Sequence, residues 1–272
     1  MRPSAAAILH VGSFNVISAL LLVIGALVGG RTQYALWILA VAVQWATPLF
    51  SPIQRFRVRS GYMVERHGLV LIIVLGESVV AIGVGAAGLP LRPPLLGTAV
   101  LALMVSALMW WLYFIDDDGR GERALAAADE PHRPALVLSA FFYAQIPMLL
   151  GVVVFATGVK LAIGHPTAAV DGPAALCLAG GVALYLLGSA VFRLAVRGPW
   201  LRRTAAAVPA LATVALGPSA GALAELAALV VLLVALLLIE GRAEHRAADR
   251  LGSAAAESPP APPPARQVHG PA

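Results

Sequence analysis

The chain has 272 residues, of which 60% are hydrophobic and only 12% are charged. A soluble domain carries about 25% charged residues, so this chain has too little polar surface to cover a globule of its size in water. The composition excludes an ordinary soluble domain and indicates that most of the chain faces lipid or other lipid-embedded segments. Only α-helices and closed β-barrels satisfy their backbone groups in hydrocarbon, and the long, non-alternating apolar runs disfavour barrel strands. The sequence therefore predicts an all-α, polytopic bundle of transmembrane helices.

Charge and cysteine content narrow the possible functions further. The formal net charge is +5, but the arginines lie beside the apolar runs and form no basic domain, so they indicate membrane topology and no nucleic-acid partner. The single cysteine, Cys177, lies inside an apolar run, where we expect a small buried side chain. One cysteine excludes an intrachain disulfide and a thiolate cluster, and no pair of histidines has zinc-ligand spacing. We predict no metal and no cofactor; the expected partners are the lipid bilayer and a proton or small solute, and the oligomeric state stays open.

Eight apolar segments are candidates for membrane spans. They lie at 11–30, 34–50, 67–88, 95–115, 136–159, 174–196, 205–217 and 222–239. The first is too long for a signal peptide, so we expect it to be a retained span. The segments 34–50 and 205–217 are short for a span of about 20 residues and lie close to prolines, so these two are the most prone to merge, tilt or cross half-way. We therefore expect about eight spans in a helical domain at 1–252.

The distribution of positive charges supports this topology. If the N-terminus is cytoplasmic, the inside segments hold 16 of the 19 Lys and Arg residues, and the outside loops hold only Arg31, Arg92 and Lys160. Removing one central span would destroy this alternation. By the positive-inside rule we expect both termini to be cytoplasmic, in a bacterial inner membrane.

Two polar segments lie outside the predicted spans. The loop at 116–134 carries six acids and three arginines, and it is either a solvated connector or, at Asp116, Asp117 and Asp118, an edge that binds a cation or a partner. Consecutive residues on a helix point in different directions, so a three-ligand site there requires the chain to unwind. The segment 253–272 is rich in proline and alanine, and we expect a disordered tail.

The third apolar segment carries the most informative charges. Glu65, Arg66 and His67 lie at its cytoplasmic edge, and Glu77 lies near its middle. A charge at that depth costs about 2.5–3.5 kcal/mol on insertion scales, and such residues mark a functional site by default. We therefore predict a binding site at Glu65, Arg66, His67 and Glu77.

Helical geometry gives an expected orientation for Glu77. At 3.6 residues per turn it shares a stripe with Ala81, Gly85 and Gly88. Small residues allow a neighbouring helix to approach closely, so we expect Glu77 to point at protein and away from lipid. The candidate polar partners within the spans are Asn15, Gln44 and Gln145.

The same segment resembles a known family. The motif Glu65–Gly68 followed by Leu75–Ser78 is similar to the signature of the bacterial low temperature requirement A family of membrane proteins. The stretches Trp110–Phe114, Pro147–Gly151 and Tyr185–Arg193 agree in character, so the resemblance covers roughly residues 10–240. Family members usually begin with an acidic-aromatic stretch in an earlier span, and the resemblance implies a member that lacks the family's N-terminal spans. The family name reports a phenotype, so the resemblance leaves the activity open.

Three functions are consistent with these observations. In the first, a site around Glu77, gated from the cytoplasm by Glu65 and Arg66, moves or senses a proton or a small solute. In the second, the protein is a non-catalytic structural or assembly protein in which Glu77 only bridges helices. The third function is a membrane enzyme acting on a lipid. It is the weakest of the three because no paired acidic motif lies on one cytoplasmic face, and we therefore expect no enzymatic activity. Glu225, near the outer end of the last segment, is interpreted as a snorkelling or capping residue.

Overall fold

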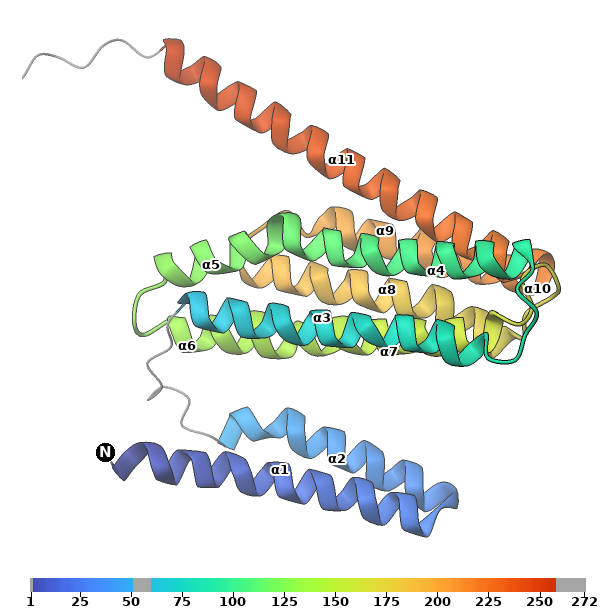
Figure 1. Ribbon diagram of the computed structural model, residues 1–272. Coiled ribbons are helices and arrows are strands. Elements are labelled where there is room, and N and C mark those ends of the chain that lie inside the picture. Colours follow the sequence, from blue (N-terminus) through green and yellow to red (C-terminus); the bar gives the residue numbers. More distant parts are fainter. Residues whose placement is uncertain (1, 51–59, 258–272) are drawn as a thin grey trace, which may run out of the picture.

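The computed structural model describes residues 2–50 and 60–257. All regular elements in these two ranges are helical, and none of the described residues forms a strand. α3, α4, α7 and α8 run roughly side by side, whereas α11 lies obliquely to them (Figure 1). This arrangement confirms the all-α helical bundle that the composition predicts.

The first two helices form a hairpin. α1 (Arg2–Val28) and α2 (Gly30–Phe50) are joined at Gly29. Gly29 and Gly30 have φ values of +70° and +61°, which residues other than glycine rarely adopt. The two glycines therefore allow the chain to reverse direction between α1 and α2. Along the hairpin the Ser18 hydroxyl donates to the Ala40 carbonyl at 3.2 Å.

Five long helices form the body of the bundle. They are α3 (Ser60–Gly85), α4 (Pro93–Leu112), α7 (Gln145–Ala162), α8 (Gly172–Ala195) and α11 (Ala222–Glu257). Shorter elements connect them: the π-helices η2 (Tyr113–Asp117) and η3 (Val137–Tyr143), the helices α5 (Asp118–Ala127), α6 (Arg133–Leu136), α9 (Leu201–Ala212) and α10 (Leu216–Ala220), and the 3-10 helix η4 (Thr213–Ala215). One end of the bundle carries α5 and α6 and the other carries α10 (Figure 1); these are called the α5 end and the α10 end below.

All eight predicted segments fall on helices. Five stretches within the described residues are long and apolar enough to cross a membrane: Gly61–Gly85, Pro93–Ala127, Arg133–Ala162, Gly172–Ala195 and Ala222–Ala243. The segments 11–30 and 34–50 correspond to α1 and α2. The expected number of about eight spans is therefore confirmed at the level of helical segments.

The seventh segment is a broken helix. Residues 201–220 are divided among α9, η4 and α10. Pro209 and Pro218 each remove a backbone N–H and so interrupt the hydrogen-bond ladder. The three pieces follow one another along the chain, and 20 helical residues rise about 30 Å, which matches the hydrocarbon thickness of a bilayer. The short predicted segment at 205–217 thus belongs to a longer, interrupted one.

α7 and α8 pack with their backbones in contact. A Cβ atom at Gly151 on α7 would lie 2.6 Å from the Tyr185 nitrogen on α8, and a Cβ atom at Gly158 would lie 2.6 Å from the Leu178 nitrogen. In lipid there is no hydrophobic driving force between helices, so helices associate through close packing, which small residues allow. These glycines therefore hold the tightest helix pair in the bundle.

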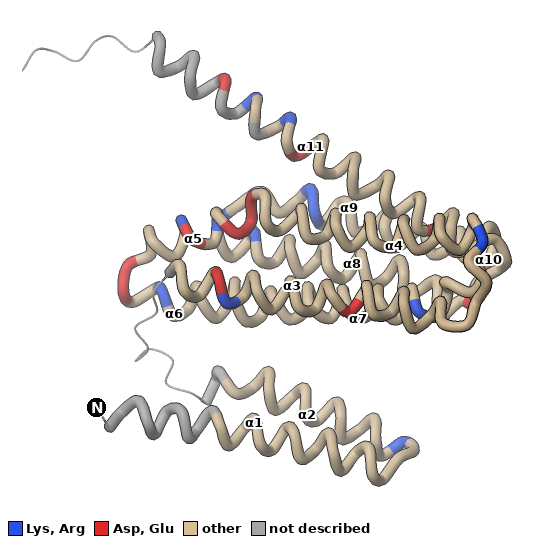
Figure 2. Tube along the Cα trace, in the orientation of Figure 1, with Lys and Arg blue, Asp and Glu red and all other residues tan. Residues whose placement is uncertain are grey.

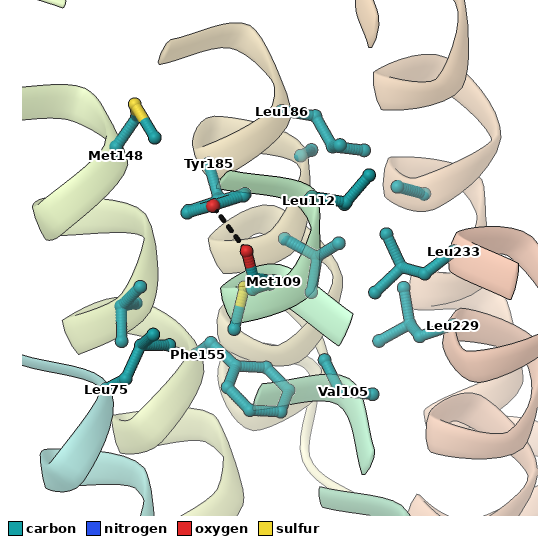
Figure 3. Close-up of a cluster of buried hydrophobic side chains, with 14 of the residues drawn as sticks. Leu75, Val105, Met109, Leu112, Met148, Phe155, Tyr185, Leu186, Leu229 and Leu233 are labelled. Atoms are coloured by element: carbon teal, nitrogen blue, oxygen red, sulfur yellow. Dashed lines mark hydrogen bonds between the residues drawn. The ribbon is translucent and has the colours of Figure 1, made fainter. Parts of the chain in front are cut away.

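Apolar side chains fill the space between the long helices. Figure 3 shows Leu75 of α3, Met109 of α4, Phe155 of α7 and Leu229 of α11 converging around Tyr185 of α8. The Tyr185 hydroxyl donates to the Met109 carbonyl at 2.6 Å, which satisfies the polar tip of a side chain that is otherwise surrounded by hydrocarbon. Large apolar side chains also cover the outer surface, as lipid contact requires; examples are Ile73, Val208 and Val231.

α11 extends past the bundle at its C-terminal side (Figure 1). It runs to Glu257 and so includes 253–257, the first part of the predicted tail. The remainder of that tail, 258–272, lies outside the described residues.

Candidate functional site

Glu77 lies on the outer side of α3. Its neighbour Ser78 is fully buried, together with Leu71 and Leu75, whereas Glu77 is exposed in the described chain. Leu71 lies about 120° around the helix from Glu77, so packing of the leucine face turns the carboxylate outward. The expectation that Glu77 points at a neighbouring helix is therefore wrong for the described residues. The later positions of the expected stripe do reach protein: Ala81 is buried, and a Cβ atom at Gly85 would lie 2.8 Å from the Lys160 carbonyl.

The three expected partners of Glu77 bond to other groups. The Gln44 side-chain amide donates to the Asn15 side-chain oxygen at 3.0 Å, within the α1–α2 hairpin. The Gln145 amide donates to the His67 carbonyl at 3.4 Å. These contacts fasten helices to one another and leave the partner of Glu77 undefined.

Glu65, Arg66 and His67 lie at the α5 end of α3 and are not brought to Glu77. The Arg66 guanidinium lies 4.6 Å from the centre of the Tyr62 ring, and His67 Nδ1 lies 2.8 Å from the Met63 carbonyl. Glu65 and Glu77 are separated by a rise of about 18 Å along the helix. The four residues do not form one pocket within the described chain.

Glu65 instead lines a hollow with two other acids. A cavity of about 290 Å³ lies between α3 and the η2–α5 segment, with Glu65, Asp118 and Glu122 in its wall. Within residues 2–50 and 60–257, no group of His, Cys, Asp and Glu has the geometry to hold a metal ion. The hollow is a recess between helices in which three acids lie among apolar residues.

The most highly charged interior of the protein lies next to this hollow. Asp117, Arg193, Arg203 and Glu240 are 0%, 1%, 1% and 6% exposed, and Ser189 beside them is fully buried. They come from η2, α8, α9 and α11, so four separate elements meet there. We call these five residues the ion network. Figure 2 shows that charged residues are otherwise sparse along the long helices.

Arg193 lies at the centre of the ion network. Its Nε donates to Asp117 Oδ1 at 2.6 Å. Its Nη1 donates to Glu240 Oε1 at 2.8 Å, and its Nη2 reaches Glu240 Oε2 at 3.2 Å. One guanidinium on α8 thus joins a carboxylate on η2 to a carboxylate on α11, in the planar fork geometry that suits arginine.

Arg203, on α9, binds the same two acids as Arg193. Its Nε and Nη2 each donate to Glu240, both at 2.9 Å. Its Nη1 donates to the Ser189 hydroxyl at 2.9 Å and lies 3.7 Å from Asp117 Oδ2. Ser189 in turn donates to Asp117 Oδ2 at 3.1 Å. Every charged group in the ion network therefore has at least two partners, and the two positive charges balance the two negative ones.

Asp116 and Arg120 form the outer rim of the ion network. Asp116 accepts from Arg193 Nη2 at 3.4 Å and also pairs with Arg120, one helical turn later. Their side chains are 15% and 25% exposed, whereas those of Arg193 and Asp117 are 1% and 0% exposed. The rim therefore connects the buried charges to the surface at the α5 end.

The local winding of η2 places Asp117 inside the bundle. The cap amide of Asp118 bonds to the carbonyl of Tyr113, five residues back, as in a π-helix, which is rare and is found frequently at functional sites. Asp117 is fully buried while Asp118 is only half-buried. The predicted three-acid edge is therefore divided: Asp117 belongs to the ion network, Asp116 to its rim and Asp118 to the hollow.

Two other expectations need correction. Glu225, interpreted as a snorkelling or capping residue, is 0% exposed, and neither carboxylate oxygen has a hydrogen-bond partner in the described residues. The α10–α11 turn at Gly221 folds the start of α11 against α8 and α10. The carboxylate is therefore enclosed by helices and does not reach outward as a snorkelling side chain does. Cys177 is half-buried at the α7–α8 contact and is not fully enclosed.

The fold and the ion network define an integral membrane protein with several helical spans and one cluster of buried charges among the described residues. A family model described as bacterial low temperature requirement A protein matches residues 2–240. The chain therefore belongs to the bacterial low temperature requirement A family.

One curated relative gives a partial alignment. The uncharacterized protein RA0937 of Rhizobium meliloti (strain 1021) is 27% identical over 188 residues, which cover 64% of this chain and 44% of the relative. The chain thus spans less than half the length of that protein. No solved structure matches this chain.

Proposed function

We propose that this protein is transporter-like and moves or senses a proton or small solute, with the ion network closing its pathway at the α5 end. The observation that carries this proposal is the burial of two arginines and two acids, contributed by four elements, in a chain otherwise made for lipid. Ionisable residues in membrane spans are expensive, and they usually mark ion or substrate pathways.

The balance of charges suits a contact that opens and closes. Arg193 and Arg203 neutralise Asp117 and Glu240 when the helices are together. When the helices separate, water solvates the same groups, so the pairing energy is offset by recovered hydration. An apolar contact has no such compensation in water. A buried network of this kind therefore supports two states of similar free energy.

Polar atoms away from the ion network also favour a pathway. Ser78 Oγ, Tyr113 Oη and Gln145 Oε1 are buried without a hydrogen-bond partner in the described residues. They belong to α3, η2 and α7. Unsatisfied polar atoms inside a membrane bundle are costly, so we expect them to bind water or the transported species during function.

The residues of the sequence-based site enter this proposal at the entrance. Glu65 lines the acidic hollow with Asp118, which is the direct neighbour of the buried Asp117. We propose that Glu65, Arg66 and His67 guide a proton or a cationic solute toward the ion network, and that Glu77 acts on the outer side of α3. By the positive-inside rule, the α5 end and both termini face the cytoplasm, and the membrane is the bacterial inner membrane.

A flux measurement tests this function. Purified protein is reconstituted into liposomes, and proton flux under an imposed membrane potential is followed with an internal pH dye, alongside a panel of labelled small solutes. We expect flux in the wild type and a several-fold change in Glu240→Gln, which leaves two arginines facing one acid. Glu130→Gln, an exposed acid in the α5–α6 connection, is the matched control and leaves flux unchanged. Wild-type liposomes that match empty liposomes for every species would overturn the proposal.

One observation favours the structural alternative. All the guanidinium nitrogens of Arg193 and Arg203 have acceptors within the bundle. This complete pairing is what a structural contact that does not open requires. In that case Glu240→Gln lowers the melting temperature and no variant conducts. Flux and melting temperature of the same variants therefore distinguish a structural contact from one that opens during transport.

A further inference from the structure

A second buried acid lies at the opposite end of the bundle. Glu225 belongs to the first turn of α11, at the α10 end. Its side chain lies beside the backbone of Ala179 on α8, and a Cβ atom at Gly217 would lie 2.5 Å from its Oε2. Neither oxygen has a hydrogen-bond partner in the part of the chain that the structure describes. A carboxylate in this position is enclosed and has no charged partner among the described residues.

The surrounding backbone is interrupted. The broken segment α9–η4–α10 ends beside Glu225, and Gly221, with φ +87°, turns the chain into α11. Membrane proteins tolerate interrupted helices where the backbone is buried in protein or lines a cavity, and transporters place ion-binding groups at such breaks. The break therefore supplies a second, independent indication that this position binds something.

The neighbouring charges leave Glu225 without a partner. The sequences of α4, η4 and α10 contain no titratable side chain. The titratable groups of the other elements near α11 lie elsewhere: Cys177 at the α7–α8 contact, Tyr185 on the Met109 carbonyl, Arg193 and Arg203 in the ion network, and Arg92, Lys160, His165, Asp171 and Arg202 exposed. Among the described residues, no salt bridge to Glu225 is formed. A resident cationic side chain therefore does not neutralise it.

The packing limits what Glu225 can bind. Gly217 and Ala175 pack where the carboxylate lies, and the described residues offer no set of three ligand groups for a metal ion. A proton needs neither space nor further ligands. Protonation also removes the charge whose burial is costly, so the enclosed state matches the neutral acid.

We infer that Glu225 is a proton-binding site reached from the α10 end, and that it is the outer counterpart of the ion network. This inference rests on the proposed function. α11 carries both Glu225 and Glu240, fifteen residues and about 22 Å apart, with Leu229 and Leu233 buried between them. Loss of the proton makes the carboxylate seek water and draws the start of α11 away from Gly217. Movement of the same helix then changes the position of Glu240.

Infrared difference spectroscopy of the reconstituted protein tests this site directly. We expect a carbonyl-stretch band of a protonated carboxylic acid that appears and disappears as the external pH is varied. Glu225→Gln, which copies the shape of the neutral acid and so keeps the packing, removes the band. The control Glu130→Gln, at an exposed acid of the α5–α6 connection, retains it. A titrating band that persists in Glu225→Gln, or the absence of any such band in the wild type, would overturn the assignment.

The outcome separates this inference from the proposed function. Flux without a Glu225 band leaves the transport proposal standing and refutes the proton site. A Glu225 band without flux of any species supports the proton site and refutes transport. When both are present, Glu225→Gln is expected to reduce proton-coupled flux at least ten-fold.

Discussion

Arg193 Nε donates to Asp117 Oδ1 at 2.6 Å, between side chains that are 1% and 0% exposed. Because α8 supplies the arginine and the π-helix η2 supplies the acid, this pair fixes the end of α4 against α8. Breaking a buried pair by removing one partner leaves an uncompensated charge.

Replacing Asp117 by Asn is expected to destabilise the protein strongly. The substitution keeps the shape of the side chain but leaves Arg193 and Arg203 facing a single buried acid, Glu240. We expect the free energy of unfolding in detergent to fall by about 3–5 kcal/mol, measured by thermal or denaturant unfolding of purified protein. Asp129→Asn, at an exposed acid of the α5–α6 connection, is the control; equal effects of the two changes would contradict the role given to Asp117.

Arg203 and Glu240 are expected to be coupled in a double-mutant cycle. Each single change to Met leaves a buried charge without its fork partner, whereas the double change removes both charges and leaves the Arg193–Asp117 pair. The double variant should therefore be less destabilised than the sum of the single variants, by about 1–3 kcal/mol. Additive effects on the melting curves would mean that the bidentate contact at 2.9 Å contributes little.

The α7–α8 contact predicts a cost for a single added methyl group. Gly151→Ala places a Cβ atom 2.6 Å from the Tyr185 nitrogen, so the backbones must separate, at about 1–3 kcal/mol. Gly76→Ala on α3 meets nothing within 4 Å and is expected to be neutral or slightly stabilising, since alanine is the better helix former. The two variants are compared by melting temperature, and a larger loss in Gly76→Ala would refute the packing argument.

Gly217→Ala tests the environment of Glu225 without replacing the acid itself. The added Cβ atom would lie 2.5 Å from Glu225 Oε2 and 2.5 Å from the Ala175 Cβ atom, so the acid and the α8–α10 contact must shift. We expect the infrared band of Glu225 to differ from that of the wild type, because the added methyl group changes the surroundings of the carboxylate. Gly172→Ala, at a position with open space, serves as the control and leaves the titration in place.

Thiol labelling in intact cells tests the orientation. In a Cys177→Ala background, Glu130→Cys at the α5 end is expected to react only after the membrane is made permeable. Arg92→Cys, between α3 and α4 at the other end, reacts with an impermeant reagent added outside. Both positions are exposed, so the difference reports the side of the membrane and not burial. The reverse pattern would invert the proposed topology.

The helical architecture was predictable because lipid imposes it. Long apolar runs without alternation have only one way to satisfy their backbone, so all eight segments proved to be helical. The sequence also signals the break, since the short segment 205–217 contains Pro209 and is followed directly by Pro218, and proline interrupts helices. Local chemistry was sufficient in both cases.

The ion network was not predictable from the same reasoning, although it left a signal. Arg193 lies inside the apolar segment 174–196 and Glu240 directly follows the segment 222–239, and both lie where a topology signal also belongs. Charges at span ends are ambiguous, because an arginine that faces the cytoplasm and one that faces a carboxylate on another helix look alike in sequence. Only the tertiary arrangement shows that Asp117, 76 residues away, is the partner of Arg193.

The opposite error concerned Glu77. The stripe of small residues predicts a direction around the helix for Glu77, yet that direction depends on which face has the stronger packing. The leucine face of α3 lies about 120° from Glu77 and decides the orientation. A small-residue stripe of four positions did not outweigh that face.

The glycine contact between α7 and α8 also determines how the bundle can deform. Two helices whose backbones touch have no side-chain layer that can slide or change rotamer, so they move only together. Any rearrangement is then described most simply with this pair as a fixed frame. Arg193 of α8 belongs to this frame, and Glu240 of α11 lies outside it. A probe pair for distance measurements is therefore best placed with one label on α8 and one on α11, where the full amplitude of a change in state would be recorded.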